Sequence, residues 1–245
     1  MSARLQTKDN WIGLGIDTGG TFTDAAIVDL SNHEVLAKAK APTTYQDLSK
    51  GIDKAVEGVL QADVCTLEDI KLVGMSTTIA TNSILQGKGG RVGLIGIGWT
   101  PQENWVLGCD KAEFVRGSYD SVGSQIEPLD DKEIVEAVAR VITRVDAVVV
   151  SGIFSVYNPT HELRVKREIS EKTPIPVVLG CTLTGDLGIM ERTITAVLNA
   201  RLIPIMGDFM TAAERSLRSK GINARIMVFK GDGGLMSLDA AKERP

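Results

Sequence analysis

The chain has 245 residues, of which 43% are hydrophobic and 24% are charged, and its formal net charge is −4. These values are ordinary for a globular protein with one large domain or two small ones. The acidic balance gives nucleic-acid binding no electrostatic support, and no apolar run approaches the ~20 residues that span a bilayer. We therefore expect neither a nucleic-acid nor a membrane partner.

The first ten residues and the cysteines predict a cytoplasmic protein. Residues 1–10 are polar and lack the apolar core of a signal peptide. Cys65, Cys109 and Cys181 are odd in number and far apart, which favours reduced, buried thiols over disulfides or a zinc site.

Two short apolar runs flank a glycine-rich turn near the start of the chain. Residues 11–16 predict a buried strand, and residues 25–28 predict a second one. The turn between them, from Asp17 to Asp24, contains two glycines and several hydroxyls. Strand, Gly-Gly turn and strand together predict a β-hairpin.

The composition of this turn suits the phosphate chain of a nucleotide that binds with a divalent cation. Glycines let backbone N–H groups approach an anion, and threonine hydroxyls donate to phosphate oxygens. A carboxylate such as Asp17 repels phosphate, so its presence implies Mg²⁺ between them. A plain hairpin built from turn-favouring residues is the alternative, and the chemistry alone leaves both open. The residues assigned to phosphate contact are Thr18, Gly19, Gly20, Thr21 and Thr23.

Two better-known phosphate loops are excluded. A Walker A loop needs Lys and then Ser or Thr after its second glycine, whereas Thr21 and Phe22 follow Gly20. A dinucleotide fingerprint needs a third glycine where Thr18 stands, and a helix where a strand follows.

The next segments predict a third strand over residues 33–39, with His33 in a solvated turn, and a helix over residues 48–60 that buries one face on the sheet. Residues 72–75 predict a parallel-type strand that ends in three hydroxyl residues and leads into a helix through Leu85. Open α/β sheets bind ligands at such strand ends, although a helix N-cap needs only one hydroxyl. The residues assigned to a site here are Thr77, Thr78 and Asn82.

The middle of the chain is predicted to contain two strands and a helix, interrupted by a loop-rich insertion. Residues 91–96 predict a strand, and residues 99–125 predict a loop-rich insertion under which Trp99 and Trp105 pack. Asp130 then predicts a helix N-cap, with Glu133 completing a capping box. A fully buried strand is expected over residues 147–150.

Asn158 and Pro159 predict the N-cap and first residue of another helix. His161 in its first turn is either a catalytic base or, as we favour, a residue that hydrogen-bonds its own loop. Prolines confine the strand predicted over residues 174–179 to a sheet edge.

A long helix is predicted from Gly188 to Lys220, kinked or split at Pro204 and ended by Gly221. Its polar side is expected to carry Glu191, Arg192, Thr195 and Asn199, and its apolar side to include Leu198.

Residues 226–229 predict the last strand, and a second Asp-Gly-Gly turn follows it. This turn is either a second anion or metal contact or a plain turn, and the two are equally favoured. Its residues are Asp232, Gly233 and Gly234.

The stretch GIDTGGTFTDAAIVD resembles the first phosphate loop of the actin, hexokinase and sugar-kinase superfamily. The resemblance is strongest to the hydantoinase A and oxoprolinase family, which includes subunits of acetone and acetophenone carboxylases. Further stretches match in order at residues 76–85, 154–165, 191–204 and 231–241.

The resemblance implies an α/β fold, a ribonuclease-H-like lobe whose mixed sheet opens with an antiparallel three-strand unit. It also implies ATP and Mg²⁺ as cofactors, with Asp17 as a catalytic residue and metal ligand. It divides the chain into an amino-terminal family domain, residues 10–180, and the start of the hydantoinase A domain, residues 181–245.

The implied function is an ATP-dependent hydrolase that opens a cyclic amide after phosphoryl transfer to a carbonyl-derived oxygen. Water or a second enzyme subunit would resolve the activated intermediate. A ketone carboxylase subunit, a small-molecule kinase and a non-catalytic one-lobe module stay open as alternatives. The family's second phosphate loop would lie after Pro245, so we expect the amino-terminal portion of a longer enzyme. The sequence does not identify the substrate.

Overall fold

The computed structural model describes residues 11–44 and 47–245. The chain forms two compact units, residues 1–86 with 206–245 (unit 1) and residues 87–205 (unit 2). The predicted boundary between residues 180 and 181 concerns family segments rather than compact units, and it stays a prediction. Among the described residues, no helix is both long enough and apolar enough to cross a membrane.

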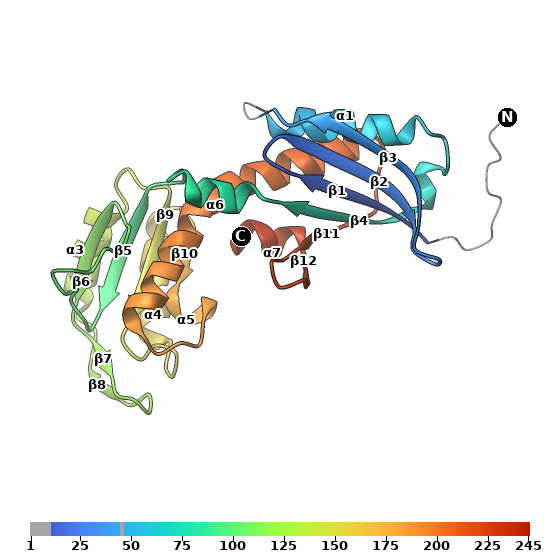
Figure 1. Ribbon diagram of the computed structural model, residues 1–245. Helices are drawn as coiled ribbons and strands as arrows, with labels where there is room; N and C mark the ends of the chain where they lie inside the picture. Colours follow the sequence, from blue (N-terminus) through green and yellow to red (C-terminus); the bar gives the residue numbers. More distant parts are fainter. Residues whose placement is uncertain (1–10, 45–46) are drawn as a thin grey trace. The chain divides into compact units, whose positions relative to one another are not determined.

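Unit 1 is built on a six-stranded sheet in the order β12-β11-β4-β1-β2-β3 (Figure 1). Strands β1, β2 and β3 pair antiparallel, β4 is parallel to β1, and β11 is parallel to β4. The predicted mixed sheet with an antiparallel opening is therefore confirmed. The elements of unit 1 are β1 (Ile12–Thr18), β2 (Phe22–Asp29), β3 (Glu34–Pro42), α1 (Leu48–Leu60), η1 (Leu67–Asp69), β4 (Ile70–Thr77), α2 (Ile79–Leu85), β11 (Arg225–Phe229), β12 (Leu235–Ser237) and α7 (Leu238–Glu243).

Helix α1 covers the sheet beside β1, β2 and β3, as the apolar spacing predicts (Figure 1). Its bounds agree with the prediction, and Asp47 caps it by accepting a hydrogen bond from the Ser49 N–H. Ile52, Val56 and Val59 are fully buried, and burial stabilises side chains of this size by about 1.5–3 kcal/mol each.

Unit 2 contains a parallel four-stranded sheet in the order β10-β9-β5-β6 and a small antiparallel pair, β7-β8. Its elements are β5 (Val92–Ile97), β6 (Lys111–Val115), β7 (Ser118–Tyr119), β8 (Gln125–Glu127), α3 (Asp131–Val141), β9 (Ala147–Gly152), α4 (Thr160–Lys172), β10 (Val177–Leu179), α5 (Gly180–Leu183) and the first part of α6 (Ile189–Ser219).

Helices cover both faces of the parallel sheet. On one face, side chains of α3 and α4 pack on Ile95, Ile97, Val148 and Val150. On the other face, the first part of α6 packs on the alternate residues of the same strands. Strand β9 is completely buried, as predicted, and β10 lies at the sheet edge that its preceding prolines indicate.

Three local predictions in unit 2 are corrected. The expected loop over residues 99–125 contains β6, an edge strand of the sheet, although Trp99 and Trp105 do pack together at 5.9 Å between ring centroids. Helix α4 begins at Thr160, one residue later than predicted. The Glu133 carboxylate does not close a capping box, because it accepts from the Arg116 backbone N–H and guanidinium.

Helix α6 differs from the prediction at two side chains. Arg192, expected on the polar side, is completely buried, whereas Leu198, expected on the apolar side, is exposed. Pro204 lies inside one continuous helix rather than splitting it. Gly221 follows with a φ of 83°, as its predicted role in ending the helix requires.

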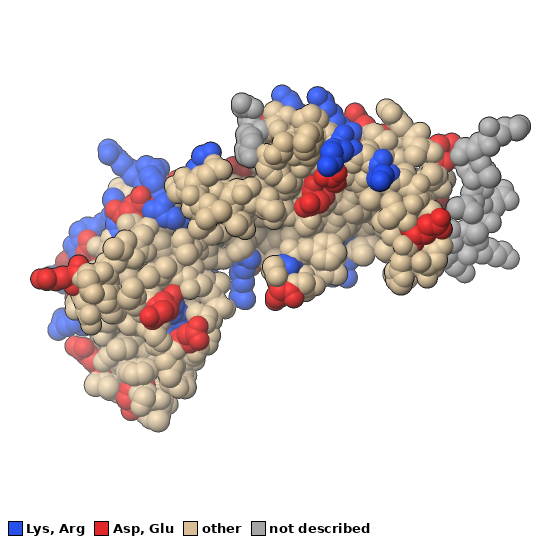
Figure 2. All heavy atoms as spheres, viewed as in Figure 1, with Lys and Arg blue, Asp and Glu red and all other residues tan. Residues whose placement is uncertain are grey.

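The three cysteines are free thiols that are half-buried rather than fully buried. On the face drawn in Figure 2, basic and acidic side chains are interspersed over each unit.

Candidate functional site

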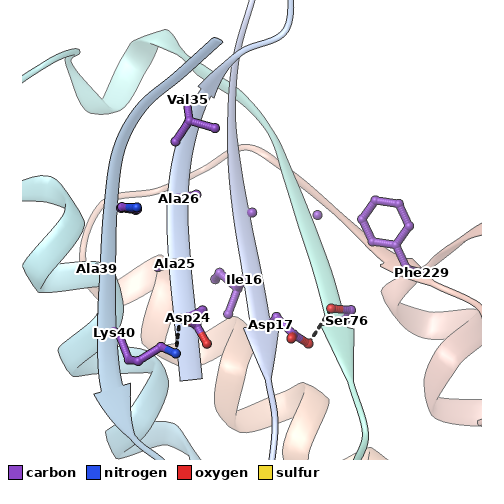
Figure 3. Close-up of a pocket in the computed structure, with 13 residues that line it drawn as sticks. Ile16, Asp17, Asp24, Ala25, Ala26, Val35, Ala39, Lys40, Ser76 and Phe229 are labelled. Atoms are coloured by element: carbon purple, nitrogen blue, oxygen red, sulfur yellow. Dashed lines mark hydrogen bonds and ion pairs between the residues drawn. The ribbon is translucent and has the colours of Figure 1, made fainter. Parts of the chain in front are cut away.

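Four adjacent strands of unit 1 each place one polar residue at the same height on one face of the sheet (Figure 3). Ser76 lies opposite Asp17, Asp17 lies opposite Asp24, and Asp24 lies opposite Lys40. We call these four residues the polar row. It forms at the carboxyl ends of β1 and β4, which is the edge at which open α/β sheets bind ligands.

The polar row is bonded at both ends and carries two carboxylates in its middle. The Ser76 hydroxyl donates to Asp17 Oδ1 at 2.6 Å, and Lys40 Nζ lies 3.2 Å from Asp24 Oδ1. Asp17 and Asp24 face each other directly across the hairpin, where side chains are about 4.5–5.5 Å apart at Cβ. Like charges in this position repel, so a cation placed near them would be bound favourably.

A row of small residues lies next to the polar row and forms the floor of a hollow. Gly74, Gly15 and Ala26 are cross-strand neighbours in this row. The hollow has a volume of about 750 Å³, and Val35 and Phe229 bound it (Figure 3). This volume falls within the ~300–1,000 Å³ typical of small-molecule sites.

Residues 19–21 connect β1 to β2 beyond the polar row, and we call them the glycine loop. A hydrogen bond from the Gly19 N–H to the Phe22 carbonyl at 3.0 Å closes it. Gly19 and Gly20 are half-buried, and Thr21 is exposed. The loop therefore presents backbone and one hydroxyl at the surface, as a phosphate contact would require.

Thr18 and Thr23 lie on the other face of the sheet from Asp17 and Asp24. Both are completely buried, because side chains alternate along each strand. Thr23 Oγ1 lies 3.1 Å from Thr43 Oγ1, and Thr18 Oγ1 has no hydrogen-bond partner among the described residues. The side chains of these two residues do not line the hollow, although both were assigned to phosphate contact.

The start of α2 is tied to the end of β1. Thr77 Oγ1 and the Thr78 N–H both donate to the Thr18 carbonyl, at 3.0 and 3.2 Å. Thr77 Oγ1 also accepts from the N–H of Ile79, the first residue of α2, and Asn82 Nδ2 donates to Thr78 Oγ1. The structure thus ties Thr77 and Thr78 to the residue that precedes the glycine loop, and Asn82 to Thr78.

The second Asp-Gly-Gly turn follows β11, whose carboxyl end lies at the same sheet edge as that of β4. The Asp232 carboxylate accepts from Lys230 Nζ at 2.7 Å and from the Gly234 N–H at 2.8 Å. The Lys230 bond lowers the pKa of this carboxyl group most. Gly233 has a φ of 82°, which favours glycine. These contacts account for the turn locally, and a further anion contact stays a prediction.

His161 lies in unit 2, where its ring packs on Tyr119 at 4.2 Å between centroids. Burial lowers the pKa of the imidazole. Its buried Nδ1 has no partner among the described residues, so this atom does not form the predicted hydrogen bond to the loop.

The donor atoms of the polar row fit Mg²⁺. Asp17, Asp24 and Ser76 offer only oxygen atoms, which Mg²⁺ prefers, and Mg²⁺ is commonly held by one or two carboxylates together with phosphates and water. No group of three or more acidic, His or Cys side chains within the described part of the chain forms a metal cage. A bound Mg²⁺ would therefore depend on phosphate oxygens for its remaining ligands.

Sequence reasoning missed Asp24, Lys40 and Ser76 as members of this site. Asp24 was noted in the turn but not assigned, Ser76 was counted among the three hydroxyls at a strand end but not assigned, and Lys40 lies just beyond the predicted third strand. The register of the sheet is what brings them to Asp17.

Comparison with known proteins gives consistent matches over nearly the whole chain. Residues 13–173 match the family model described as hydantoinase/oxoprolinase N-terminal region, and residues 192–245 match the one described as hydantoinase/oxoprolinase. The acetophenone carboxylase gamma subunit of Aromatoleum aromaticum is 31% identical over 268 residues, covering 94% of this chain and 36% of that protein.

Two solved structures share the fold. Nucleotide-free acetone carboxylase superposes with a TM-score of 0.80 at 23% identity, covering 96% of this chain and 38% of that one. ATP-dependent caprolactamase from Pseudomonas jessenii superposes with a TM-score of 0.72 at 28% identity, covering 91% of this chain and 36% of that one. The chain thus spans a little over a third of the length of each of these three relatives.

Proposed function

This chain belongs to the hydantoinase/oxoprolinase family, and we propose that it is the amino-terminal part of an ATP-dependent hydrolase that opens cyclic amides. The observation that carries the proposal is the exposed Asp17 carboxylate at the end of β1, beside the glycine loop. A relative of this chain is an ATP-dependent caprolactamase, whose name states a cyclic amide substrate.

In the proposed reaction, the glycine loop holds the phosphate chain of ATP through its backbone N–H groups. Asp17, oriented by the Ser76 hydroxyl, and Asp24 are the residues that would hold Mg²⁺. When bound, Mg²⁺ would neutralise charge on the phosphates during transfer. Lys40 balances the charge of Asp24, so the row is not left with two uncompensated carboxylates.

The proposed chemistry proceeds in three steps. The γ-phosphoryl group passes from ATP to the carbonyl oxygen of the amide, and ADP leaves. Water then adds to the activated carbon and the ring C–N bond breaks, which leaves an amine and an acyl phosphate. A second water hydrolyses the acyl phosphate to the carboxylate and inorganic phosphate. Thr77, Thr78 and Asn82 are proposed to border the cleft in which this occurs, since Thr77 and Thr78 contact Thr18 at the start of the glycine loop and Asn82 contacts Thr78.

A ketone carboxylase is the second candidate, because the acetophenone carboxylase gamma subunit is 31% identical to this chain. That relative is a subunit, so we also propose that a second kind of subunit completes the enzyme. The two candidates differ in their requirements. In the longer protein, a carboxylase needs bicarbonate for ketone-dependent ATP cleavage, and a lactam hydrolase cleaves ATP with a lactam alone.

Calorimetric titration with ATP–Mg²⁺ tests the nucleotide site, in this chain and in the longer protein. We expect Asp17→Ala to weaken binding at least about tenfold, since a charge-assisted contact is worth ~1.5–3 kcal/mol. Asp239→Ala is the matched control, because its carboxylate is 92% exposed on α7. Equal binding by wild type and Asp17→Ala would remove Asp17 from the site.

A further inference from the structure

Thr43, the residue that follows β3, donates two hydrogen bonds to the glycine loop. Its hydroxyl donates to the Gly19 carbonyl at 2.9 Å, and its backbone N–H donates to the Thr21 carbonyl at 2.9 Å. Its Oγ1 also lies 3.1 Å from Thr23 Oγ1. One residue therefore contacts two positions of the loop and one of β2, 20 to 24 residues away in sequence.

Proton counting fixes the direction of this small network. A threonine hydroxyl has one proton, and that of Thr43 is used on the Gly19 carbonyl. The bond between the two hydroxyls must then run from Thr23 to Thr43. Thr23 thus acts as a donor to Thr43, and its buried hydroxyl has no proton left for a ligand.

The two carbonyls that Thr43 holds determine where the following N–H groups point. In a trans peptide the carbonyl and the next N–H lie in one plane and point in opposite directions. Because the Gly19 and Thr21 carbonyls point back at Thr43, the N–H groups of Gly20 and Phe22 point away from it. N–H groups aimed together in this way form an anion-binding nest.

The surroundings of Thr43 leave little room for it to move. Helix α1 comes close at Gly51, where an added Cβ would lie 2.8 Å from Thr23 Oγ1 and 3.3 Å from the Pro42 carbonyl. Pro42 itself pairs with Phe22 at the end of the β2–β3 ladder. The loop, the end of β3 and α1 therefore form one tightly packed assembly behind the glycines.

We propose that Thr43 is a positioning residue, which aims the N–H groups of Gly20 and Phe22 toward the phosphates of the bound nucleotide. This inference rests on the proposed nucleotide site. It assigns no chemistry to Thr43 itself, which acts only through the backbone of the loop.

Three variants test the role of the hydroxyl. Thr43→Val keeps the shape and the backbone bond to Thr21 but loses the bond to Gly19, and Thr43→Ser keeps both. Thr44→Val changes the neighbouring threonine as a control. We expect Thr43→Val to weaken ATP–Mg²⁺ binding about tenfold, whereas Thr43→Ser and Thr44→Val stay within about twofold of wild type. Wild-type affinity in Thr43→Val, or no rescue in Thr43→Ser, would overturn the proposal.

Amide hydrogen exchange measured by NMR without nucleotide provides a readout that does not depend on ATP binding. In Thr43→Val the Gly19 amide, which donates to the Phe22 carbonyl at 3.0 Å, should exchange at least about tenfold faster, because the loop is no longer held. The Leu30 amide, which donates to the Trp11 carbonyl at the other end of the hairpin, should be unaffected. If wild type binds no ATP, the proposed function fails, but the Gly19 exchange still decides whether Thr43 holds the loop. Unchanged exchange at Gly19 would contradict the inference. If Thr43→Val does not fold, Thr43→Ala replaces it, and Thr23→Val, which leaves the Gly19 bond intact, should leave the Gly19 exchange within about twofold of wild type.

Discussion

Glu162 is a completely buried carboxylate that accepts three hydrogen bonds in unit 2. Oε1 accepts from the Gly152 N–H at 2.8 Å and from Ser155 Oγ at 2.5 Å, and Oε2 accepts from the Cys181 N–H at 3.2 Å. In Glu162→Gln, the new NH₂ group would face the Cys181 N–H, leaving that donor unsatisfied at a cost of ~1–3 kcal/mol. The other two bonds would lose their charge assistance, at about 0.5–1 kcal/mol each.

We therefore expect Glu162→Gln to lower the free energy of unfolding of unit 2 by about 3 kcal/mol. With a urea m-value of ~1.5 kcal/mol/M, the unfolding midpoint would fall by ~2 M. Tryptophan fluorescence reports on this region, because Trp99 Nε1 donates to the Ser151 carbonyl at 2.8 Å, next to Gly152. A Trp11→Phe background removes the tryptophan of unit 1.

The control is Glu136→Gln on the surface of α3. The Glu136 side chain is 53% exposed and lies 3.8 Å from Arg140, so its loss should change the stability by less than ~0.5 kcal/mol. A Glu162→Gln midpoint within about 0.3 M of wild type would refute the reasoning that these three bonds hold the end of β9.

Two further predictions concern ionisation in unit 2. Burial, followed by the neighbouring Glu162, raises the pKa of the Cys181 thiol to about 12, so iodoacetamide at pH 8 should label Cys181 at least ~100-fold more slowly than a peptide thiol, as mass spectrometry would show. Burial lowers the pKa of His161, so on acidification the unfolded chain binds this proton first. The stability contribution is present above pH ~6.5 and is lost as pH falls toward the lowered folded pKa, by at most ~1.4 kcal/mol per unit. Urea unfolding from pH 7 to pH 5 should show this loss in wild type and a smaller one in His161→Phe, and equal slopes would contradict it.

Local patterns predicted unit 1 well because its elements are encoded by neighbouring residues. The apolar spacing over residues 48–60 gave α1 its bounds, and the Gly-Gly turn gave the β1–β2 hairpin. The same hairpin also held a signal that went unused. A turn centred on Gly20 and Thr21 puts Asp24 opposite Asp17, and strand alternation then turns Thr18 to the buried face.

The missed features of unit 2 depend on partners distant in sequence. Strand β6 has charged residues at alternate positions and only five residues, so its periodicity is weak until it pairs with β5. Arg192 looks like a surface residue of an amphipathic helix. It is buried because its guanidinium donates to the carbonyls of Asp186 and of Gly152, which lies 40 residues away in sequence. The spacing of residues within the helix cannot predict these acceptors, because they lie outside the helix.

The arrangement of unit 1 explains why two threonines of the glycine-rich turn contribute in a different way from the rest. The hairpin register sends Asp17 and Asp24 to the open face and Thr18 and Thr23 to the face under α1. The open face carries two carboxylates, Asp17 and Asp24, but only one lysine of the polar row, Lys40, and this excess of negative charge favours a further cation. On the buried face, the Thr23 hydroxyl contacts Thr43, whose own hydroxyl holds the Gly19 carbonyl. In the proposed phosphate loop, the open face would attract the metal and the buried face would keep the backbone N–H groups aimed.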